Sequence, residues 1–270
     1  MARADQDRYA ELARLAAETA LAVGDRIRVD DIAIVTRKRG RANFATAADH
    51  AAEIEILRRL RAYDRAIPVL AEESADRKLR TADRLWVVDP LDGTLNFSRA
   101  LPFYCVAIAY VEDGKTRAAA VHAPRTGELF VAHEGGGAML HAARIAVSTV
   151  SRASEAFAVT SLAFKAASRK DSRFTELNAT VARLRVIGSA ALEICYVACG
   201  RFDLFVHEAL APWDVAAAAL IAREAGAVVR SLKTGADGAW DEPQVAIGNP
   251  KIVRDLFSKV PLLVRKPKRA

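Results

Sequence analysis

The sequence is organised around the stretch Trp86-Val87-Val88-Asp89-Pro90-Leu91-Asp92-Gly93-Thr94-Leu95-Asn96-Phe97. Its apolar start predicts a buried strand that runs directly into turn residues. Pro90 has a fixed φ and keeps Asp89 out of the helical region, so Asp89 and Asp92 are expected to converge at the strand end. Gly93 and Thr94 add backbone amides and a hydroxyl beside them. Mg²⁺ prefers such oxygen ligands and shares them with phosphate. An Asp-rich turn formed for local reasons is the alternative.

Two other segments place carboxylates at the ends of expected elements. Residues 67–71 predict a short apolar strand that delivers Glu72 and Glu73 at its end. Pro212 and Trp213 place Asp214 in the first turn of an Ala-rich buried helix that is expected to end at Gly226. The three carboxylate-bearing segments are therefore candidates for one shared site.

These segments resemble, in order and spacing, the motifs of the inositol monophosphatase family of Mg²⁺-dependent, lithium-sensitive sugar phosphatases. Residues 89–97 resemble its first signature, residues 212–218 its second, and Glu72-Glu73-Ser74 its upstream element. The resemblance covers the chain from about Asp49 to Gly248. It implies an α+β / α/β fold of the family's type, a five-layered α-β-α-β-α sandwich, and a homodimer.

The resemblance also implies the site residues. The predicted metal ligands, for two or three Mg²⁺ ions, are Glu72, Asp89, the carbonyl of Leu91, Asp92 and Asp214. The predicted catalytic residues are Glu72, Thr94 and Asp49. The predicted substrate contacts are Gly93, Thr94, Gly188, Ser189, Ala190 and His207. Four carboxylates around one site would repel strongly without cations, which favours the metal interpretation.

The expected reaction is hydrolysis of a small phosphate monoester by direct in-line attack of water, without a covalent phosphoenzyme. One metal ion is expected to lower the pKa of a bound water, and another to stabilise the leaving alkoxide. Thr94 and Asp49 would orient that water. The amides of Gly93 and Thr94 would hold the phosphate.

Two features of the sequence bear on the substrate. Family members that act on inositol phosphates carry a glutamate seven residues before the second-signature aspartate, and here that position is His207. Glu208 cannot simply replace it, because neighbouring strand residues face opposite sides. Asn96 and Phe97 resemble the inositol branch. Inositol 1-phosphate or a similar polyol phosphate is therefore expected, with histidinol phosphate, fructose 1,6-bisphosphate and adenosine 3′,5′-bisphosphate as alternatives.

The net charge of +7 is local. Eight positive charges lie in two clusters, residues 37–41 and the tail 265–269, which leaves −1 elsewhere. A polyanion-binding regulatory protein is the non-enzyme alternative. A near-neutral body without interleaved basic and aromatic residues argues against it, so no specific nucleic acid partner is expected. The cluster at 37–41 could instead attract an anionic substrate. A catalytically inactive scaffold would require loss of a metal ligand, and all are present.

Composition and patterning set the remaining expectations. No apolar run reaches transmembrane length, the N-terminus lacks a signal-peptide core, and three cysteines form no C-x-x-C pair, so a cytoplasmic protein without a membrane partner is expected. Residues 1–150 are expected to form an N-terminal half with an antiparallel sheet and the main metal site. Residues 151–264 would form an α/β half that closes the site, and residues 265–270 a disordered basic tail.

Three helix and strand predictions are specific enough to test. Residues 6–23 predict an amphipathic helix that ends at Gly24. Thr46 and Asp49 have the spacing of a capping box, before a helix expected to turn Ile54, Leu57 and Leu60 inward. Residues 103–147 alternate with period two and predict an antiparallel meander, with a hairpin turn at Asp113-Gly114. Alternating strands and helices are expected to follow, one strand being 185–187.

Overall fold

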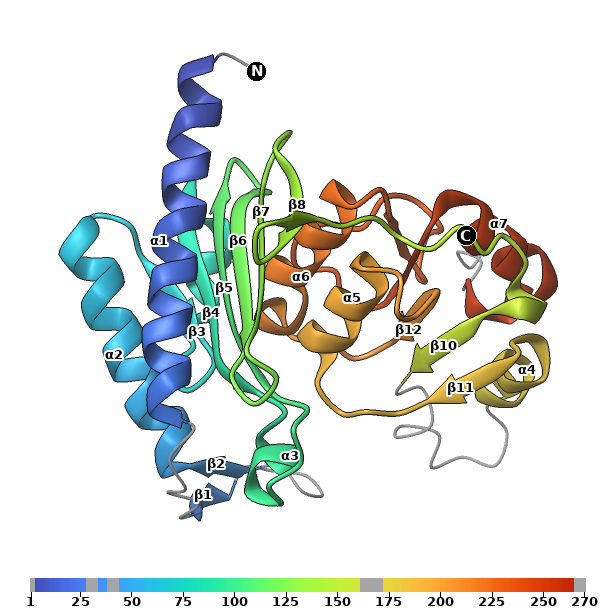
Figure 1. The fold of residues 1–270 in the computed structure, drawn as a ribbon, viewed down its shortest axis with the longest axis horizontal. Coiled ribbons are helices and arrows are strands. Elements are labelled where there is room, and N and C mark those ends of the chain that lie inside the picture. The colour runs from blue at the N-terminus through green and yellow to red at the C-terminus, as the bar shows by residue number, and fades with distance from the viewer. Residues whose placement is uncertain (1–2, 28–33, 38–43, 161–171, 265–270) are drawn as a thin grey trace.

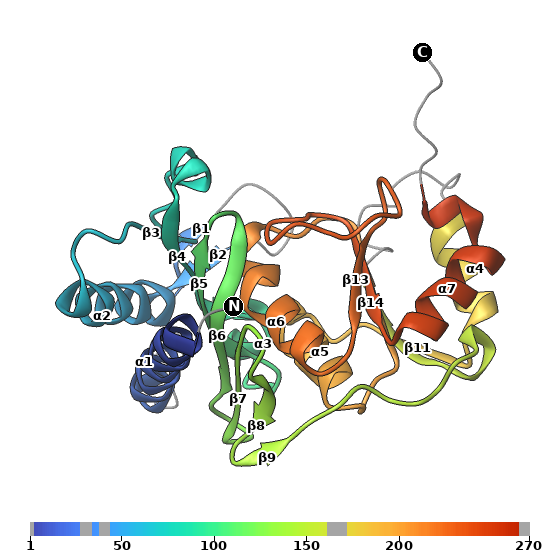
Figure 2. The ribbon, with the colours of Figure 1, turned by 90° about the horizontal axis from the view of Figure 1, so that it is seen from above.

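The chain forms five layers, as predicted. The computed structural model describes residues 3–27, 34–37, 44–160 and 172–264. Figure 2 shows a helix pair, a sheet, a second helix pair, a second sheet and a third helix pair. The helix pairs are α1 (Arg3–Ile27) with α2 (Ala47–Tyr63), α5 (Ala190–Ala198) with α6 (Pro212–Glu224), and α4 (Ser172–Thr180) with α7 (Pro250–Lys259). This is the α-β-α-β-α sandwich expected from the sequence.

The first sheet is a seven-stranded meander in the order β3-β4-β5-β6-β7-β8-β9. Its strands are β3 (Val69–Ala71), β4 (Arg84–Asp92), β5 (Cys105–Glu112), β6 (Lys115–Ala123), β7 (Glu128–His133), β8 (Gly137–Leu140) and β9 (Ala143–Arg144). Only β3 and β4 pair in parallel, and the other pairs are antiparallel. Asp113 and Gly114, both with positive φ, form the predicted β5–β6 hairpin turn.

The second sheet has five strands in the order β11-β10-β12-β14-β13. They are β10 (Phe157–Thr160), β11 (Arg183–Arg185), β12 (Leu204–His207), β13 (Val228–Ser231) and β14 (Val245–Gly248). β10 runs parallel to β11 and β12, whereas β14 is antiparallel to β12 and β13. The strand predicted at 185–187 lies two residues earlier, because a side chain rather than a neighbouring strand binds the amide of Ile187. β13 was not predicted.

Smaller elements connect the layers. In the described part of the chain they are the antiparallel pair β1 (Ile34–Arg37) and β2 (Phe44–Thr46), the short helix α3 (Thr94–Ser98), and the 3-10 turns η1 (Arg77–Thr81), η2 (Ala153–Glu155) and η4 (Pro261–Leu263). Most of the basic cluster at 37–41 and all of the tail at 265–270 lie outside the described residues. The hypotheses attached to those two segments therefore stay predictions.

Helices α5 and α6 lie between the two sheets and explain why the halves pack as one body. Both helices are apolar on nearly all sides, as expected of elements covered on two faces. Their residues join those of β5, β6 and β14 in one hydrophobic cluster. Helix α6 comes from the second half of the chain but packs on the first sheet. The division of the chain into two halves at residue 150 stays a prediction.

Two helix predictions need correction. Helix α1 runs through Gly24 to Ile27 instead of ending there. The glycine serves close packing, because a Cβ at this position would lie 2.4 Å from Cδ2 of His122 on β6. In α2 the capping box of Thr46 and Asp49 is confirmed, but Ile54 points outward with 69% of its surface exposed. Ile56 takes the buried position instead.

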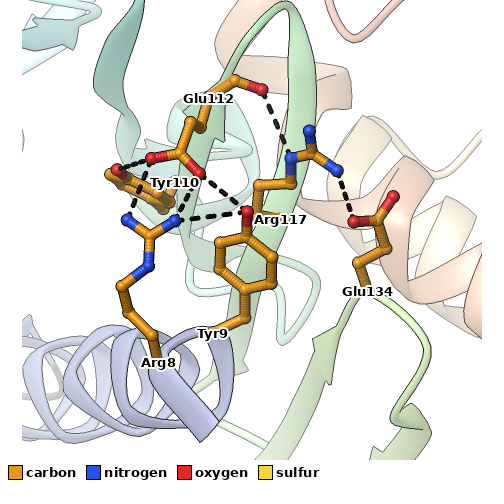
Figure 3. Close-up of polar contacts among 6 residues, drawn as sticks. All are labelled: Arg8, Tyr9, Tyr110, Glu112, Arg117 and Glu134. Carbon is orange, nitrogen blue, oxygen red and sulfur yellow. Dashed lines mark hydrogen bonds and ion pairs between the residues drawn. The ribbon is translucent and has the colours of Figure 1, made fainter. Parts of the chain in front are cut away.

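A charged network fastens α1 to the end of β5 (Figure 3). Arg8 donates two hydrogen bonds to Glu112, at 2.9 Å to Oε1 and 2.6 Å to Oε2. The hydroxyls of Tyr9 and Tyr110 donate to the same carboxylate, at 2.7 and 3.0 Å. The guanidinium of Arg8 is the main cause that lowers the pKa of Glu112 to about 2, and the tyrosine hydroxyls act in the same direction. The ionised carboxylate of Glu112 therefore stabilises the folded chain at neutral pH.

Within the described ranges, no helix combines the length and apolar character that a membrane crossing requires.

The Glu112 network predicts a pH-dependent contribution to stability. Replacement Glu112→Gln is expected to lower the free energy of unfolding at pH 7 by about 1–3 kcal/mol, because charged hydrogen bonds are lost. The difference should persist down to about pH 5 and shrink between pH 4.5 and 2, since a lowered carboxyl pKa stabilises only above it. Urea unfolding measures it, with exposed Asp7→Asn on the same helix as control. A pH-independent difference would contradict this account.

Candidate active site

Three carboxylates meet where β4 ends and α6 begins. Asp89 and Asp92 lie on β4, on either side of an irregularity in its pairing with β5, and Asp214 lies in the first turn of α6. One oxygen from each carboxylate lies within 4.8 Å of the others. Asp89 is buried, and Asp92 and Asp214 are partly buried. Two segments more than a hundred residues apart thus form one acidic centre, as the sequence predicted.

Backbone and side-chain donors orient each carboxylate. Oδ1 of Asp89 accepts from the amide of Leu91 at 3.0 Å. Oδ2 of Asp214 accepts from the amide of Ala211 at 2.8 Å and so caps α6. Oδ2 of Asp92 accepts from Oγ of Ser189 at 2.7 Å and from the amide of Ala191 at 2.8 Å. These hydrogen bonds fix the orientation of all three carboxylates.

The electrostatics of the centre favour the binding of a cation. Burial raises the pKa of Asp89 well above its usual value, and the charges of Glu72, Asp92 and Asp214 raise it further. Burial, with the charge of Asp92, does the same to the pKa of Asp214. Burial also raises the pKa of Asp92, although its bonds from Ser189 and the 190–191 amides oppose this. A bound cation would offset the cost of placing these charges together.

Glu72 lies beside this centre, at the end of the neighbouring strand, but its carboxylate is not one of the three whose oxygens lie within 4.8 Å of one another. β3 pairs with β4 so that Ala71 lies opposite Val88, and the amide of Glu72 donates to the carbonyl of Val88 at 3.2 Å. Glu72 therefore leaves the sheet beside Asp89, which explains its effect on the pKa of Asp89. The next amide, that of Glu73, donates at 2.8 Å to buried Glu53 on α2.

Thr94 and Asp49 form a connected pair beside the carboxylates. Oγ1 of Thr94 lies 3.0 Å from Oδ1 of Asp49 and 3.1 Å from the carbonyl oxygen of Leu91, and it can donate to either. The other oxygen of Asp49 accepts from the amide and hydroxyl of Thr46. Asp49 thus serves both as the capping residue of α2 and as the acceptor for Thr94. The two roles considered from the sequence are compatible.

Gly93 occupies a position that only glycine fits. It precedes α3 with φ of 93°, in the left-handed region. A Cβ here would lie 2.8 Å from the carbonyl oxygen of Phe103 and 3.2 Å from Cβ of Ser189. The backbone from Asp92 to Thr94 can therefore turn sharply toward the acidic centre. The predicted phosphate contacts of Gly93 and Thr94 stay predictions.

The predicted substrate contacts fall into two groups. The turn Gly188-Ser189-Ala190 lies at the start of α5 and bonds Asp92 through Ser189. His207 ends β12, stacks on Phe205, and accepts at Nδ1 from the amide of Ala209 at 3.0 Å, so a neutral ring carries its proton on Nε2. Glu208 forms a buried ion pair with Arg173 at 2.7 Å, which agrees with the expectation that it does not replace His207.

Sequence reasoning missed the residues that support the site. Asn96 donates from Nδ2 to the carbonyls of Phe103 and Ile187, at 2.7 and 2.9 Å. Sγ of Cys105 lies 3.7 Å from Oδ2 of Asp92. Glu193 binds the turn before α5. The sequence does hold a signal for Glu193, because it is the single charged residue in the apolar helix 190–198.

The donors suit a hard divalent cation. The three clustered groups, Asp89, Asp92 and Asp214, all offer carboxylate oxygens. Mg²⁺ favours such ligands and commonly shares its shell with substrate phosphate. The nearby thiol of Cys105 is directed to Asp92 instead. The residues therefore fit the metal that the sequence predicted.

Comparison with known proteins identifies the class and then the family. The family model described as the inositol monophosphatase family matches residues 5–260. The Nus factor SuhB of Vibrio cholerae is 39% identical over 230 residues, 84% of this chain and 86% of that one. A fructose-1,6-bisphosphatase/inositol-1-monophosphatase of Thermotoga maritima is 37% identical over 202 residues, 75% of each chain. An IMPase structure from the same organism has a TM-score of 0.82 at 30% identity, covering 96% of this chain and 98% of that one.

The fold and the acidic centre thus define a protein of a phosphatase family. The chain belongs to the inositol monophosphatase family.

The acidic centre predicts that Asp89→Asn affects thermal stability differently with and without Mg²⁺. In EDTA, Asp89→Asn is expected to melt at the wild-type temperature or about 2–4 °C higher, because it removes a charge from a repulsive cluster. With Mg²⁺ at a hundred times its Kd, the wild type should gain about 2.7 kcal/mol and the variant much less. Scanning calorimetry in EDTA and in Mg²⁺ measures the melting temperatures of both proteins.

The matched control is Asp203→Asn, since buried Asp203 also accepts a backbone amide, that of Phe157 at 2.7 Å, but lies outside the acidic cluster. It should leave the gain with Mg²⁺ intact. An equal gain in wild type and Asp89→Asn would refute a metal site at Asp89.

Proposed function

We propose that this protein hydrolyses a small phosphate monoester in a Mg²⁺-dependent reaction. The observation that carries the proposal is the set of three carboxylate oxygens within 4.8 Å of one another, next to the Thr94–Asp49 pair. Membership of a family whose relatives include named phosphatases supports it. The proposed metal ligands are those expected from the sequence: Glu72, Asp89, Leu91, Asp92 and Asp214.

The residues of the chain have distinct tasks in this proposal. Bound Mg²⁺ supplies the charge that neutralises phosphate oxygens and activates water for attack. Oγ1 of Thr94 accepts a hydrogen bond from that water and donates its own hydrogen to Asp49. Glu72, at the edge of the cluster, helps to orient the same water. The amides of Gly93 and Thr94 hold the phosphate, and the reaction needs no covalent intermediate.

The proposed substrate is inositol 1-phosphate or a similar polyol phosphate. The first signature, with Asn96 and Phe97, supports this choice, and the Thermotoga relative, a fructose-1,6-bisphosphatase/inositol-1-monophosphatase, adds fructose 1,6-bisphosphate as a second candidate. His207 is proposed to contact the leaving group where inositol enzymes carry a glutamate. Gly188, Ser189 and Ala190 would line the same side of the site.

The remaining family properties are proposals as well. They are two or three Mg²⁺ ions at the site, inhibition by Li⁺, a homodimer, and a cytoplasmic location. Each follows from the resemblance and can be measured directly, the oligomer by light scattering and the inhibition by adding LiCl to the phosphatase assay.

A second candidate function is non-catalytic. The relative from Vibrio cholerae is named a Nus factor and carries no phosphatase name, and the chain has a net charge of +7. A polyanion-binding regulatory protein would bind RNA or DNA with a steep salt dependence that disappears when residues 265–269 are removed. The retained acidic centre favours the phosphatase.

Phosphate release is the first activity to measure. Purified protein with Mg²⁺ is expected to release phosphate from at least one of inositol 1-phosphate, histidinol phosphate, fructose 1,6-bisphosphate and adenosine 3′,5′-bisphosphate. Asp89→Asn should abolish turnover. Thr94→Val should lower kcat by about 100-fold with a smaller change in KM, because the hydroxyl acts on the attacking water. Thr94→Ser is the matched control and should keep most of the activity.

If folded, Mg²⁺-binding protein releases phosphate from none of the four substrates, the proposed activity on small polyol, sugar and nucleotide phosphates is wrong. The nucleic-acid assay then decides the second candidate.

His207 predicts how the leaving group is recognised. Replacement His207→Ala is expected to lower kcat/KM by about tenfold for the best substrate, the effect of one lost hydrogen bond. His207→Glu should shift the preference within the panel toward inositol 1-phosphate. Exposed His141→Asn, on the first sheet, is the control. An unchanged ranking of substrates in both variants would remove His207 from the substrate site.

A further inference from the structure

The orientation of Asp92 depends on a turn from the other half of the molecule. Two donors to its Oδ2, Oγ of Ser189 and the amide of Ala191, come from the N-cap and the second residue of α5, beside the thiol of Cys105 on β5. These donors are 97 and 99 residues away in sequence. Whatever holds the turn from Ile187 to Ala191 therefore also holds Asp92.

Glu193 holds this turn from within. From the beginning of α5 it reaches back along the chain, and its Oε1 accepts from the amide of Ile187 at 2.8 Å and that of Gly188 at 3.0 Å. The carbonyl of Ile187 is bound from the opposite side by Nδ2 of Asn96, at 2.9 Å. The amide and the carbonyl of Ile187 are thus both hydrogen-bonded to side chains. The next residue, Gly188, has a φ of 90°. The turn has little freedom to shift.

The setting of Glu193 is unusual for a residue with a purely structural role. It is 2% exposed, and among the described residues it pairs with no basic side chain. Burial raises the pKa of Glu193 to about 7, while the amides of Gly188 and Ile187 act in the opposite direction. A buried carboxylate without a counterion is costly. In this position the carboxylate of Glu193 accepts hydrogen bonds from two backbone amides.

We propose that Glu193 is a positioning residue for the metal centre, which fixes the Ile187–Ala191 turn and through Ser189 and Ala191 fixes Asp92. The inference rests on the proposed function, because it takes Asp92 as a ligand of Mg²⁺. Glu193 itself touches neither the metal nor the substrate. Its effect should therefore appear in metal affinity.

Mg²⁺ affinity, measured by calorimetric titration without substrate, tests the proposal. Glu193→Ala is expected to raise the Kd for Mg²⁺ by about 10- to 100-fold, the usual effect of losing an outer-shell partner. Glu193→Gln keeps an acceptor oxygen and should stay within about threefold of wild type. Glu193→Asp is too short to reach both amides and should resemble the alanine variant. At saturating Mg²⁺, kcat of each folded variant should recover to nearly the wild-type value.

A double-mutant cycle separates positioning from general loss of stability. If Glu193 acts through the turn, Ser189→Ala and Glu193→Ala together should raise the Kd by less than the product of their separate effects. The matched control is Glu128→Gln, because buried Glu128 contacts α5 through Tyr196 but not the turn. It should lower stability without changing the Kd.

The outcomes distinguish this inference from the proposed function. A wild-type Kd in Glu193→Ala, multiplicative effects in the cycle, or an equal rise in Glu128→Gln overturns the positioning role alone. Wild type that binds Mg²⁺ but releases no phosphate overturns the proposed function, while the comparison of Kd values still tests Glu193. Wild type that binds no Mg²⁺ overturns both.

Discussion

Repulsion between carboxylates is the constraint on which this structure depends. Asp89, Asp92 and Asp214 are brought within a few ångströms of one another in a partly buried place, and burial raises the pKa of each. The surrounding fold must hold this arrangement by other means. It does so with hydrogen bonds from Leu91, Ala211 and the start of α5, and with the apolar packing of α5 and α6 between two sheets (Figure 2).

The two sheets contribute different parts of the centre. The first sheet supplies Asp89 and Asp92 from β4 and places Glu72 on the parallel neighbour β3. The central helices supply Asp214 and the amide of Ala191, which donates to Asp92. Two buried glutamates, Glu53 and Glu193, act alike near the centre. Each accepts backbone amides, one beside Glu72 and the other before Ser189.

The fold and the acidic centre could be predicted because their signals are local. Alternating residues and the Asp113-Gly114 turn gave the meander, and Pro90 and Pro212 marked where chain direction changes beside Asp89 and Asp214. The support of the centre could not be predicted in the same way, because it depends on contacts about a hundred residues apart, such as Ser189 with Asp92. Gly24 shows the same limit: nothing local distinguishes a helix end from a close approach to His122.

The alanines of α6 limit the substitutions that this helix can tolerate. Residues 216–219 are all alanine and almost completely buried, in a helix that packs on the first sheet on one side and on α5 and the second sheet on others. A larger side chain there would move the helix axis away from the sheet, since packed interiors do not absorb an added methyl group without displacement. Asp214 lies at the start of that helix, so its distance from Asp89 depends on the size of the side chains that pack α6 against the sheet. Tolerance to substitution in α6 is therefore limited by metal-site geometry as well as by packing.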